Sequence, residues 1–193
     1  MAYLAVLNTV GNQGGKTPDK DCYSTTLESW QQALVIIPPG TRLWLPFYMD
    51  GESKRIVESL GYKVVASPPM ARGGDFFKYS PDPDSYDMIF DNPPFADKSV
   101  NKRNIGLLPR LMEIGKPWVI FYPLESIQQI GVRALDKIHN FKILMPDKHF
   151  TFIRGKDDKV IKMKNIVLYH HGLIEIKDKL GYISDNISRA EWL

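Results

Sequence analysis

The feature that most constrains the fold is an alternation, from residue 41 onward, between short apolar runs and stretches with helical spacing of apolar residues. The runs are mostly continuous, as is typical of strands buried on both faces of a sheet. Chains that alternate strands and helices form mostly parallel sheets with helices on both faces. The sequence therefore predicts the α/β class, with a mostly parallel sheet and helices on both faces. The expected strands cover residues 42–47, 63–66, 86–90, 118–122 and 142–145, and the expected helices cover 52–60, 104–114 and 126–138.

A first helix is expected ahead of this alternation. Thr25 and Glu28 have the spacing of a capping box, and apolar residues recur at helical intervals behind them. The helix is expected over residues 26–35, before the Pro-Pro-Gly stop at 38–40. Residues 9–21 are rich in glycine and polar residues, which predicts a loop.

The last part of the chain changes character. Residues 150–153 and 165–169 flank a polar turn at 155–158, which predicts an antiparallel hairpin near the carboxyl end. The chain has 193 residues, of which 44% are hydrophobic, so we expect one domain over 1–193. Within it, residues 1–22 are expected to be partly mobile and 180–193 to form a flexible tail.

Charge and cysteine content narrow the function classes. A formal net charge of +3 permits a polyanionic partner without requiring one. Cys22 is the only cysteine, so no intramolecular disulfide can form, and we expect a cytoplasmic protein without a cysteine-based metal site. No stretch approaches the roughly 18 apolar residues of a membrane span, so we expect no membrane partner.

The segment with the clearest chemistry is Asp91-Asn92-Pro93-Pro94-Phe95, directly after the strand expected at 86–90. Two prolines fix φ and remove two backbone donors, so they make a rigid turn at the carboxyl end of that strand, where open α/β sheets bind ligands. The amide oxygen of Asn92 and the carbonyl oxygen of Pro93 can accept from one amino group, and Phe95 offers a flat face to a planar ring. The alternative is that the prolines end a strand and Phe95 fills the core.

This segment resembles motif IV of the S-adenosylmethionine-dependent amino-methyltransferases, which include DNA adenine-N6 and cytosine-N4 enzymes, RNA enzymes and protein-glutamine enzymes. The resemblance implies a Rossmann-like methyltransferase fold, S-adenosyl-L-methionine as cofactor and methyl transfer to an exocyclic amine, with adenine N6 in DNA as the expected substrate. It implies catalytic roles for Asn92, Pro93, Pro94 and Phe95. An RNA base or a protein glutamine remains open as the acceptor.

Other segments resemble the family's cofactor motifs, in the order of its gamma group. The stretch at 23–26 is similar to motif X, that at 45–51 to motif I and that at 74–77 to motif III. The cofactor-binding residues that this resemblance implies are Thr25, Thr26, Pro46, Phe47, Asp50, Gly51, Asp75 and Phe76.

The chain departs from the family at cofactor-facing positions. Leu45 stands where the family usually has an acid, and Met49 where it has a glycine. Ser67 follows the strand at 63–66, where many relatives have an acid for the ribose. A second hypothesis is therefore a catalytically silent relative that binds or scaffolds.

Basic and aromatic residues suggest where a nucleic acid would lie. They follow the turn at Lys98, Lys102 and Arg103, and they surround the expected hairpin at Lys148, His149, Phe150, Arg154, Lys156, Lys159, Lys162 and Lys164. Lysines there would hold phosphates, and Phe150 with His149 would contact a flipped base. The alternative is a solvated edge strand protected by lysines.

Too few residues follow the turn for the large target-recognition domain of sequence-specific DNA enzymes. A protein partner would then supply specificity, or specificity would be loose, as expected for a viral or mobile-element enzyme. His170 and His171 have no partner at metal-ligand spacing. We therefore expect no metal and place these histidines at the exposed end of a strand.

Overall fold

A computed structural model describes residues 23–47, 51–68, 72–94, 104–155, 157–173 and 180–183. The larger sheet in this part of the chain has seven strands: β2 (Arg42–Leu45), β3 (Lys63–Ala66), β4 (Met88–Asp91), β5 (Trp118–Pro123), β6 (Lys142–Pro146), β9 (Ile166–His171) and β10 (Leu180–Ile183). A three-stranded sheet contains β1 (Tyr23–Thr25), β7 (Phe150–Arg154) and β8 (Lys159–Met163). The helices are α2 (Leu27–Leu34), α3 (Glu52–Ser59), α5 (Asn104–Ile114) and α6 (Ile130–His139), with 3-10 turns η3 (Pro83–Ser85) and η4 (Leu124–Gln128).

The larger sheet has the strand order β10-β6-β9-β5-β4-β2-β3. The pairs from β3 through β2 and β4 to β5 are parallel, and β10 is parallel to β6. Strand β9 is antiparallel to both β5 and β6. This mixed but mostly parallel sheet confirms the predicted Rossmann-like α/β class.

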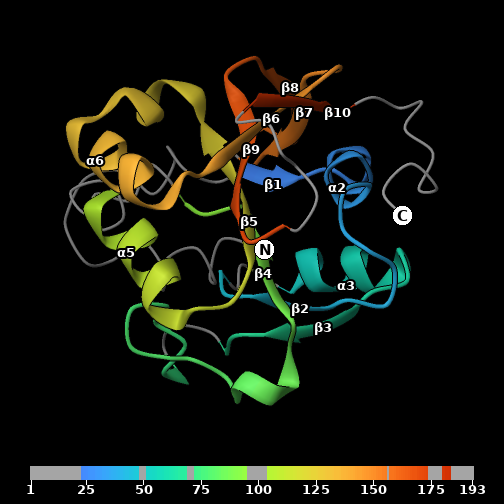
Figure 1. Ribbon diagram of the computed structural model, residues 1–193. Coiled ribbons are helices and arrows are strands. Elements are labelled where there is room, and N and C mark those ends of the chain that lie inside the picture. Colours follow the sequence, from blue (N-terminus) through green and yellow to red (C-terminus); the bar gives the residue numbers. More distant parts are fainter. Residues whose placement is uncertain are drawn as a thin grey trace.

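Helices cover both faces of this sheet because alternate strand residues point to opposite sides. On β5, Val119 and Phe121 belong to a core cluster with residues of α2 and α3, and Trp118 and Ile120 belong to a second cluster with residues of α5 and α6. Figure 1 shows α2 and α3 on one side of the sheet and α5 and α6 on the other.

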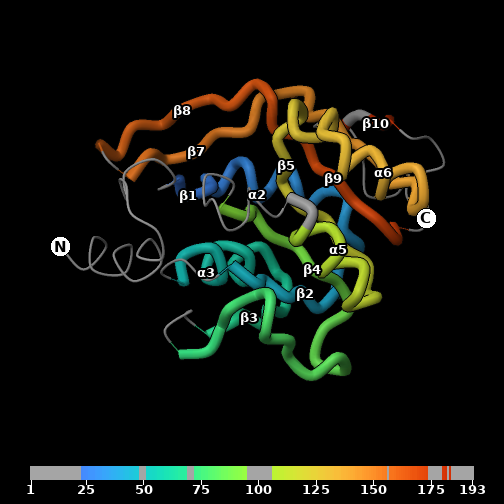
Figure 2. The backbone as a smooth tube through the Cα atoms, turned by 90° about the vertical axis from the view of Figure 1, so that its left-hand side faces the viewer, coloured from blue at the N-terminus to red at the C-terminus, as the bar shows by residue number. Residues whose placement is uncertain are grey.

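The predicted hairpin exists, but its second strand was misplaced. Strand β7 pairs with β8, with Arg154 opposite Lys159, whereas residues 166–171 form β9 in the larger sheet. Strand β8 was not predicted because its lysines interrupt the apolar run. Figure 2 shows β7 and β8 running side by side next to β1.

Two smaller differences concern the ends of the described chain. Thr26, rather than Thr25, is the N-cap of α2, and its side chain accepts from the backbone N–H of Ser29. Thr25 is instead the last residue of β1, where it lies opposite Phe152 of β7. At the other end, residues 180–183 form β10 against β6, and the rest of the expected tail lies outside the described residues. None of the described helices is long and apolar enough to cross a membrane.

Candidate functional site

The carboxyl ends of β2 and β4 lie at a topological switch point. The chain leaves β2 through α3 to reach β3 on one side, and it leaves β4 through α5 to reach β5 on the other. Open α/β sheets bind ligands at this point because the two loops diverge to opposite faces. The segments expected to hold cofactor and amine follow these two strands.

Asn92 stands directly after β4 and is held at two points. Its backbone N–H donates to Asp91 Oδ1 at 2.8 Å, and its side-chain Nδ2 donates to Thr25 Oγ1 at 3.0 Å. The side chain is half-buried, and none of the described residues donates to its Oδ1. Pro93 is buried and Pro94 half-buried behind it. The turn therefore presents one amide oxygen whose orientation is fixed from the nitrogen side.

The hydroxyl contacts of Thr25 and Thr26 are to other parts of the chain. Thr25 is buried and accepts from Asn92, which is 67 residues away in the sequence. Thr26 Oγ1 lies 2.7 Å from Thr151 Oγ1, and Ser29 Oγ donates to the Thr151 carbonyl oxygen at 2.9 Å. This hydroxyl cluster of Thr26, Ser29 and Thr151 fixes the start of α2 against β7. A cofactor contact for either threonine stays a prediction.

The loop after β2 is described at its two ends, and Met49 and Asp50 lie outside the described residues. Pro46 is buried, and the backbone N–H of Phe47 donates to Asp91 Oδ2 at 2.7 Å. Gly51 precedes α3 with φ of 85°, a left-handed conformation that favours glycine. Leu45, at the family's acid position, is 2% exposed and packs in the core.

The expected adenine-binding segment is occupied by internal contacts. Asp75 Oδ1 accepts the backbone N–H of Phe77 at 3.1 Å, and Asp75 Oδ2 lies 3.6 Å from Lys78 Nζ. Phe76 is 3% exposed and packs on Trp44 and Phe47, with ring centroids 5.9 and 5.1 Å apart. The Asp75 carboxylate therefore forms an Asx turn, and its side chain stays 29% exposed.

Ser67 does not replace the missing ribose-binding acid. It is 1% exposed, and its Oγ accepts from the indole nitrogen of Trp44 at 2.9 Å. The hydroxyl thus satisfies a buried donor on the neighbouring strand β2.

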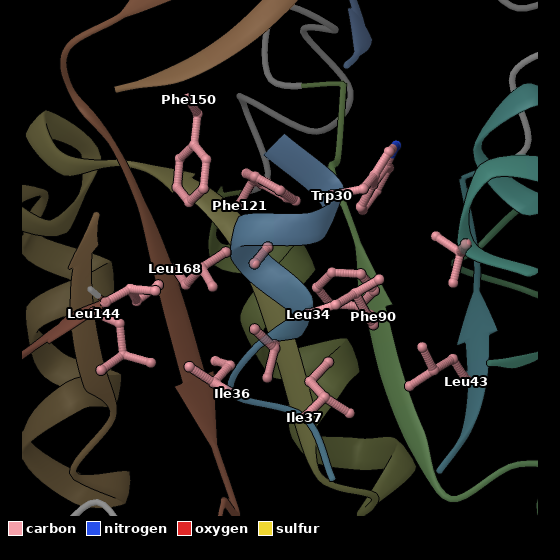
Figure 3. Close-up of a cluster of buried hydrophobic side chains, with 14 of the residues drawn as sticks. Trp30, Leu34, Ile36, Ile37, Leu43, Phe90, Phe121, Leu144, Phe150 and Leu168 are labelled. Carbon is pink, nitrogen blue, oxygen red and sulfur yellow. The ribbon is translucent and has the colours of Figure 1, made fainter. Parts of the chain in front are cut away.

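Phe150 is a correction, because the structure places it in the core. It is fully buried, and its ring centroid lies 4.8 Å from that of Phe121 in an edge-to-face contact. Figure 3 shows the ring pointing into the cluster around Phe121 and Leu168. No face of the ring is open to a base, because the first strand of the hairpin covers the larger sheet. Phe152 is also buried, whereas His149 is exposed.

The expected phosphate contacts are described in part. Lys148, Lys159, Lys162 and Lys164 are exposed, and Arg154 pairs with Asp157 at 2.5 Å. Phe95, Lys98, Lys102, Arg103 and Lys156 lie outside the described residues.

The histidines of β9 are a second correction, because only His171 lies at the end of the strand, where it is half-buried. His170 is fully buried, since β9 is an interior strand between β5 and β6. Burial, with smaller contributions from Lys142 and His171, lowers the pKa of His170 to about 4. Neither of its ring nitrogens has a hydrogen-bond partner among the described residues. His171 is half-buried and stacks on Trp118.

Asp91 is the site residue that sequence reasoning missed. It is 2% exposed, and burial raises its pKa to about 8 against the opposing effect of the N–H donors of Phe47 and Asn92. The available signal was an acid at the last position of a buried strand, immediately before the turn. Perturbed carboxyl groups of this kind cluster at functional sites.

Comparisons with known proteins give weak likenesses. No family model matches the chain, and no curated protein matches it. Among solved structures, the chain is similar to Haemonchus contortus phosphoethanolamine N-methyltransferase 2 with phosphomonomethylethanolamine and S-adenosylhomocysteine, at 9% identity and TM-score 0.41 over 76% of this chain and 38% of that one. With S-adenosyl-L-methionine, the selenomethionine form of that enzyme gives 6% identity and TM-score 0.38, over 75% of this chain and 36% of that one.

A protein from Listeria monocytogenes, described as a candidate class I S-adenosylmethionine-dependent methyltransferase, shares 12% identity. Its TM-score is 0.46, over 98% of this chain and 73% of that one. The chain spans under two fifths of the length of the Haemonchus enzyme. TM-scores below 0.5 at these identities do not assign the chain to a family.

Proposed function

We propose that this chain transfers a methyl group from S-adenosyl-L-methionine to an exocyclic amine, with adenine N6 in DNA as the substrate. The observation that carries this proposal is the turn at the switch point. There the Nδ2 of Asn92 is held by Thr25, and no described residue donates to its Oδ1. A fixed amide oxygen followed by the carbonyl of Pro93 makes a pair of acceptors suited to one amino group.

The chemistry needs such a pair. An exocyclic aromatic amine is a weak nucleophile because its lone pair is delocalised into the ring. Two acceptors that bind its hydrogens favour a more tetrahedral nitrogen, which is the form that attacks. Because Thr25 and the two prolines fix the acceptors beforehand, little reorganisation is required at the moment of reaction.

The residues present fit the cofactor in part. When bound, S-adenosyl-L-methionine would supply an electrophilic methyl group on a sulfonium. Gly51 provides a left-handed turn before α3, and Asp75 keeps part of its carboxylate exposed. The indole N–H of Trp30 is buried without an acceptor among the described residues, and its ring packs on Phe90 of β4 (Figure 3). A bound polar molecule would satisfy that donor.

The choice of a nucleic acid rests on the basic hairpin. Lys159, Lys162 and Lys164 are exposed along β8 and the turn after it. The hairpin is connected to the amine-binding turn through β1, since Thr25 lies opposite Phe152 of β7 and contacts Asn92. Phosphates held on these lysines would place a base near the turn without reading its sequence.

Two measurements test the proposal. Calorimetry should detect binding of S-adenosylhomocysteine to the wild type. Labelled cofactor, incubated with DNA, RNA and protein pools, should label DNA, and Asn92→Ala should abolish the label. Asn165→Ala, in the exposed turn before β9, is the matched control. Label in protein and not in nucleic acid would overturn the substrate assignment.

A second candidate function is a catalytically silent protein that binds nucleic acid. Specific contacts favour it: Leu45 is in the core, the Ser67 hydroxyl is bonded to Trp44, and the Asp75 carboxylate accepts from Phe77. The residues at three positions that face the cofactor in the family thus make contacts within this chain instead. DNA binding without any heat from S-adenosylhomocysteine would favour this function over methyl transfer.

A further inference from the structure

The β2–β4 pair opens before the two strands reach the proposed site. Its ladder covers Leu43 with Met88 and Trp44 with Ile89, and it ends there. Beyond the ladder, the side chain of Asp91 connects the two chain segments that follow β2 and β4. Its Oδ2 accepts the N–H of Phe47 at 2.7 Å, and its Oδ1 accepts the N–H of Asn92 at 2.8 Å. One side chain thus bonds the backbone on both sides of the switch point.

We propose that Asp91 is a positioning residue that couples the cofactor loop after β2 to the amine-binding turn after β4, so that filling one site favours filling the other. This inference rests on the proposed function for the identity of the two ligands. Asp91 is 2% exposed, so it acts through the two backbone amides and touches neither ligand.

The coupling follows from the geometry of a carboxyl group. Its two oxygens are rigidly joined, so a shift of the Phe47 amide turns the group and displaces the Asn92 amide. Thr25 holds the side chain of Asn92, and Asp91 holds its backbone. A cofactor that shifts the backbone at Phe47 therefore also shifts the backbone of Asn92, whose amide oxygen receives the amine. Coupling between ligands commonly amounts to about 5- to 150-fold in affinity.

If Asp91 had a purely structural role, it would only accept hydrogen bonds from backbone N–H groups at the ends of strands. Asp87 makes such a bond away from the proposed site and is therefore the control. Asp87 lies just before β4, and its Oδ2 accepts the N–H of Arg42 at 2.8 Å. It makes the same kind of bond to β2 at the other end of the same strand pair. It is exposed and far along the strands from the switch point.

The test measures the dissociation constant of S-adenosylhomocysteine with and without a saturating adenine-containing DNA duplex. In the wild type, and equally in Asp87→Asn, the duplex should tighten binding about fivefold or more. In Asp91→Asn the ratio should fall to about one, because the new amide nitrogen cannot accept an N–H. Its kcat should fall more than its KM changes. A wild-type ratio in Asp91→Asn would overturn the inference.

If Asp91→Asn does not fold, amide hydrogen exchange on the wild type tests the coupling instead. Saturation with S-adenosylhomocysteine should slow exchange at Asn92 as well as at Phe47. Slowing at Phe47 alone would overturn the coupling. If the wild type binds no S-adenosylhomocysteine, the proposed function falls and this inference with it. If it binds without coupling, only the inference falls.

Discussion

The two ends of the β2–β4 pair are fastened by the same chemistry in opposite environments. At the amino end, Asp87 accepts the N–H of Arg42, and at the carboxyl end Asp91 accepts the N–H of Phe47. Asp87 also pairs with the Arg42 guanidinium at 2.6 Å, and its side chain is 44% exposed. Hydrogen bonds from Arg42 lower the pKa of Asp87 to about 2, whereas burial raises the pKa of Asp91 to about 8.

The difference indicates that Asp87 only holds the two strands together, whereas Asp91 also organises the proposed site. The amino end uses an exposed ion pair, an inexpensive way to hold two strands, and its removal should cost less than about 1 kcal/mol. The carboxyl end keeps a buried ionisable group whose burial opposes its charge. Carboxyl groups with strongly shifted pKa values cluster at functional sites.

The largest expected effect is loss of activity at the carboxyl end alone. Asn92→Ala removes the fixed amide oxygen and should lower kcat about 100-fold or more, as removal of one preorganised polar group does. Asp87→Asn should leave kcat within about twofold, because it lies at the other end of the strands. Steady-state methylation of DNA measures both. Equal losses in the two variants would mean that the ends do not differ in function.

The next effect concerns the surface connected to the carboxyl end. Replacing Lys159, Lys162 and Lys164 together by glutamine should weaken DNA binding roughly tenfold and reduce the slope of log affinity against log salt by about 2 to 3. Fluorescence anisotropy with one duplex at several salt concentrations gives the slope. Replacement of Lys54 and Lys63, on α3 and β3, is the control and should leave the slope unchanged.

A smaller loss is expected from Thr25→Val, which keeps the shape of the side chain and removes the acceptor for Asn92 Nδ2. Without that bond the amide can rotate, so kcat should fall roughly tenfold. Thr25→Ser restores the hydroxyl and should recover most of the activity. Thermal unfolding of both variants checks that β1 remains paired. A Thr25→Val enzyme with full activity would remove Thr25 from the site.

The smallest effects are in stability, and they should have opposite signs with pH. Because the folded pKa of Asp87 is lowered, its contribution is present above 3.8 and lost as pH falls toward 2. Because the folded pKa of Asp91 is raised, its contribution is present below 3.8 and lost as pH rises toward 8. The wild type should therefore lose stability relative to Asp91→Asn as pH rises, by at most about 1.4 kcal/mol per unit.

Urea unfolding of the two variants and the wild type at each pH measures these differences. Comparison with the wild type cancels other titrations, such as that of His170 between 6.5 and about 4. A flat difference curve for Asp91→Asn would mean that Asp91 is not buried as described.

The sequence predicted those parts of the site that depend on neighbouring residues. A buried strand followed by Pro93 and Pro94 is a local pattern, and the turn stands where it was expected. The contact of Thr25 with Asn92 joins a strand of the smaller sheet to the turn after β4 of the larger sheet, so no spacing encodes it. Apolar content also does not distinguish a stacking ring from a core ring, which is why Phe150 was misplaced.

The same limit explains the errors in the fold. Strand β8 lies at a sheet edge, where Lys159 and Lys162 interrupt the apolar run that marks a buried strand. His170 was placed at the surface because a histidine pair next to a tyrosine appears polar in sequence. It is buried because β9 enters the sheet between β5 and β6, a topological fact that no local pattern contains.

The pairing of β1 with β7 has a consequence for how the protein matures. Thr26 and Thr151, which seal that pairing, are 125 residues apart, so a growing chain on the ribosome cannot complete it until the hairpin has been synthesised. Four strands of the larger sheet, β2, β3, β4 and β5, are synthesised before the hairpin and can pair with one another first. Asn92 acquires its contact with Thr25 only after that, so a nascent or truncated product lacking the hairpin is expected to be inactive even with its central strands formed.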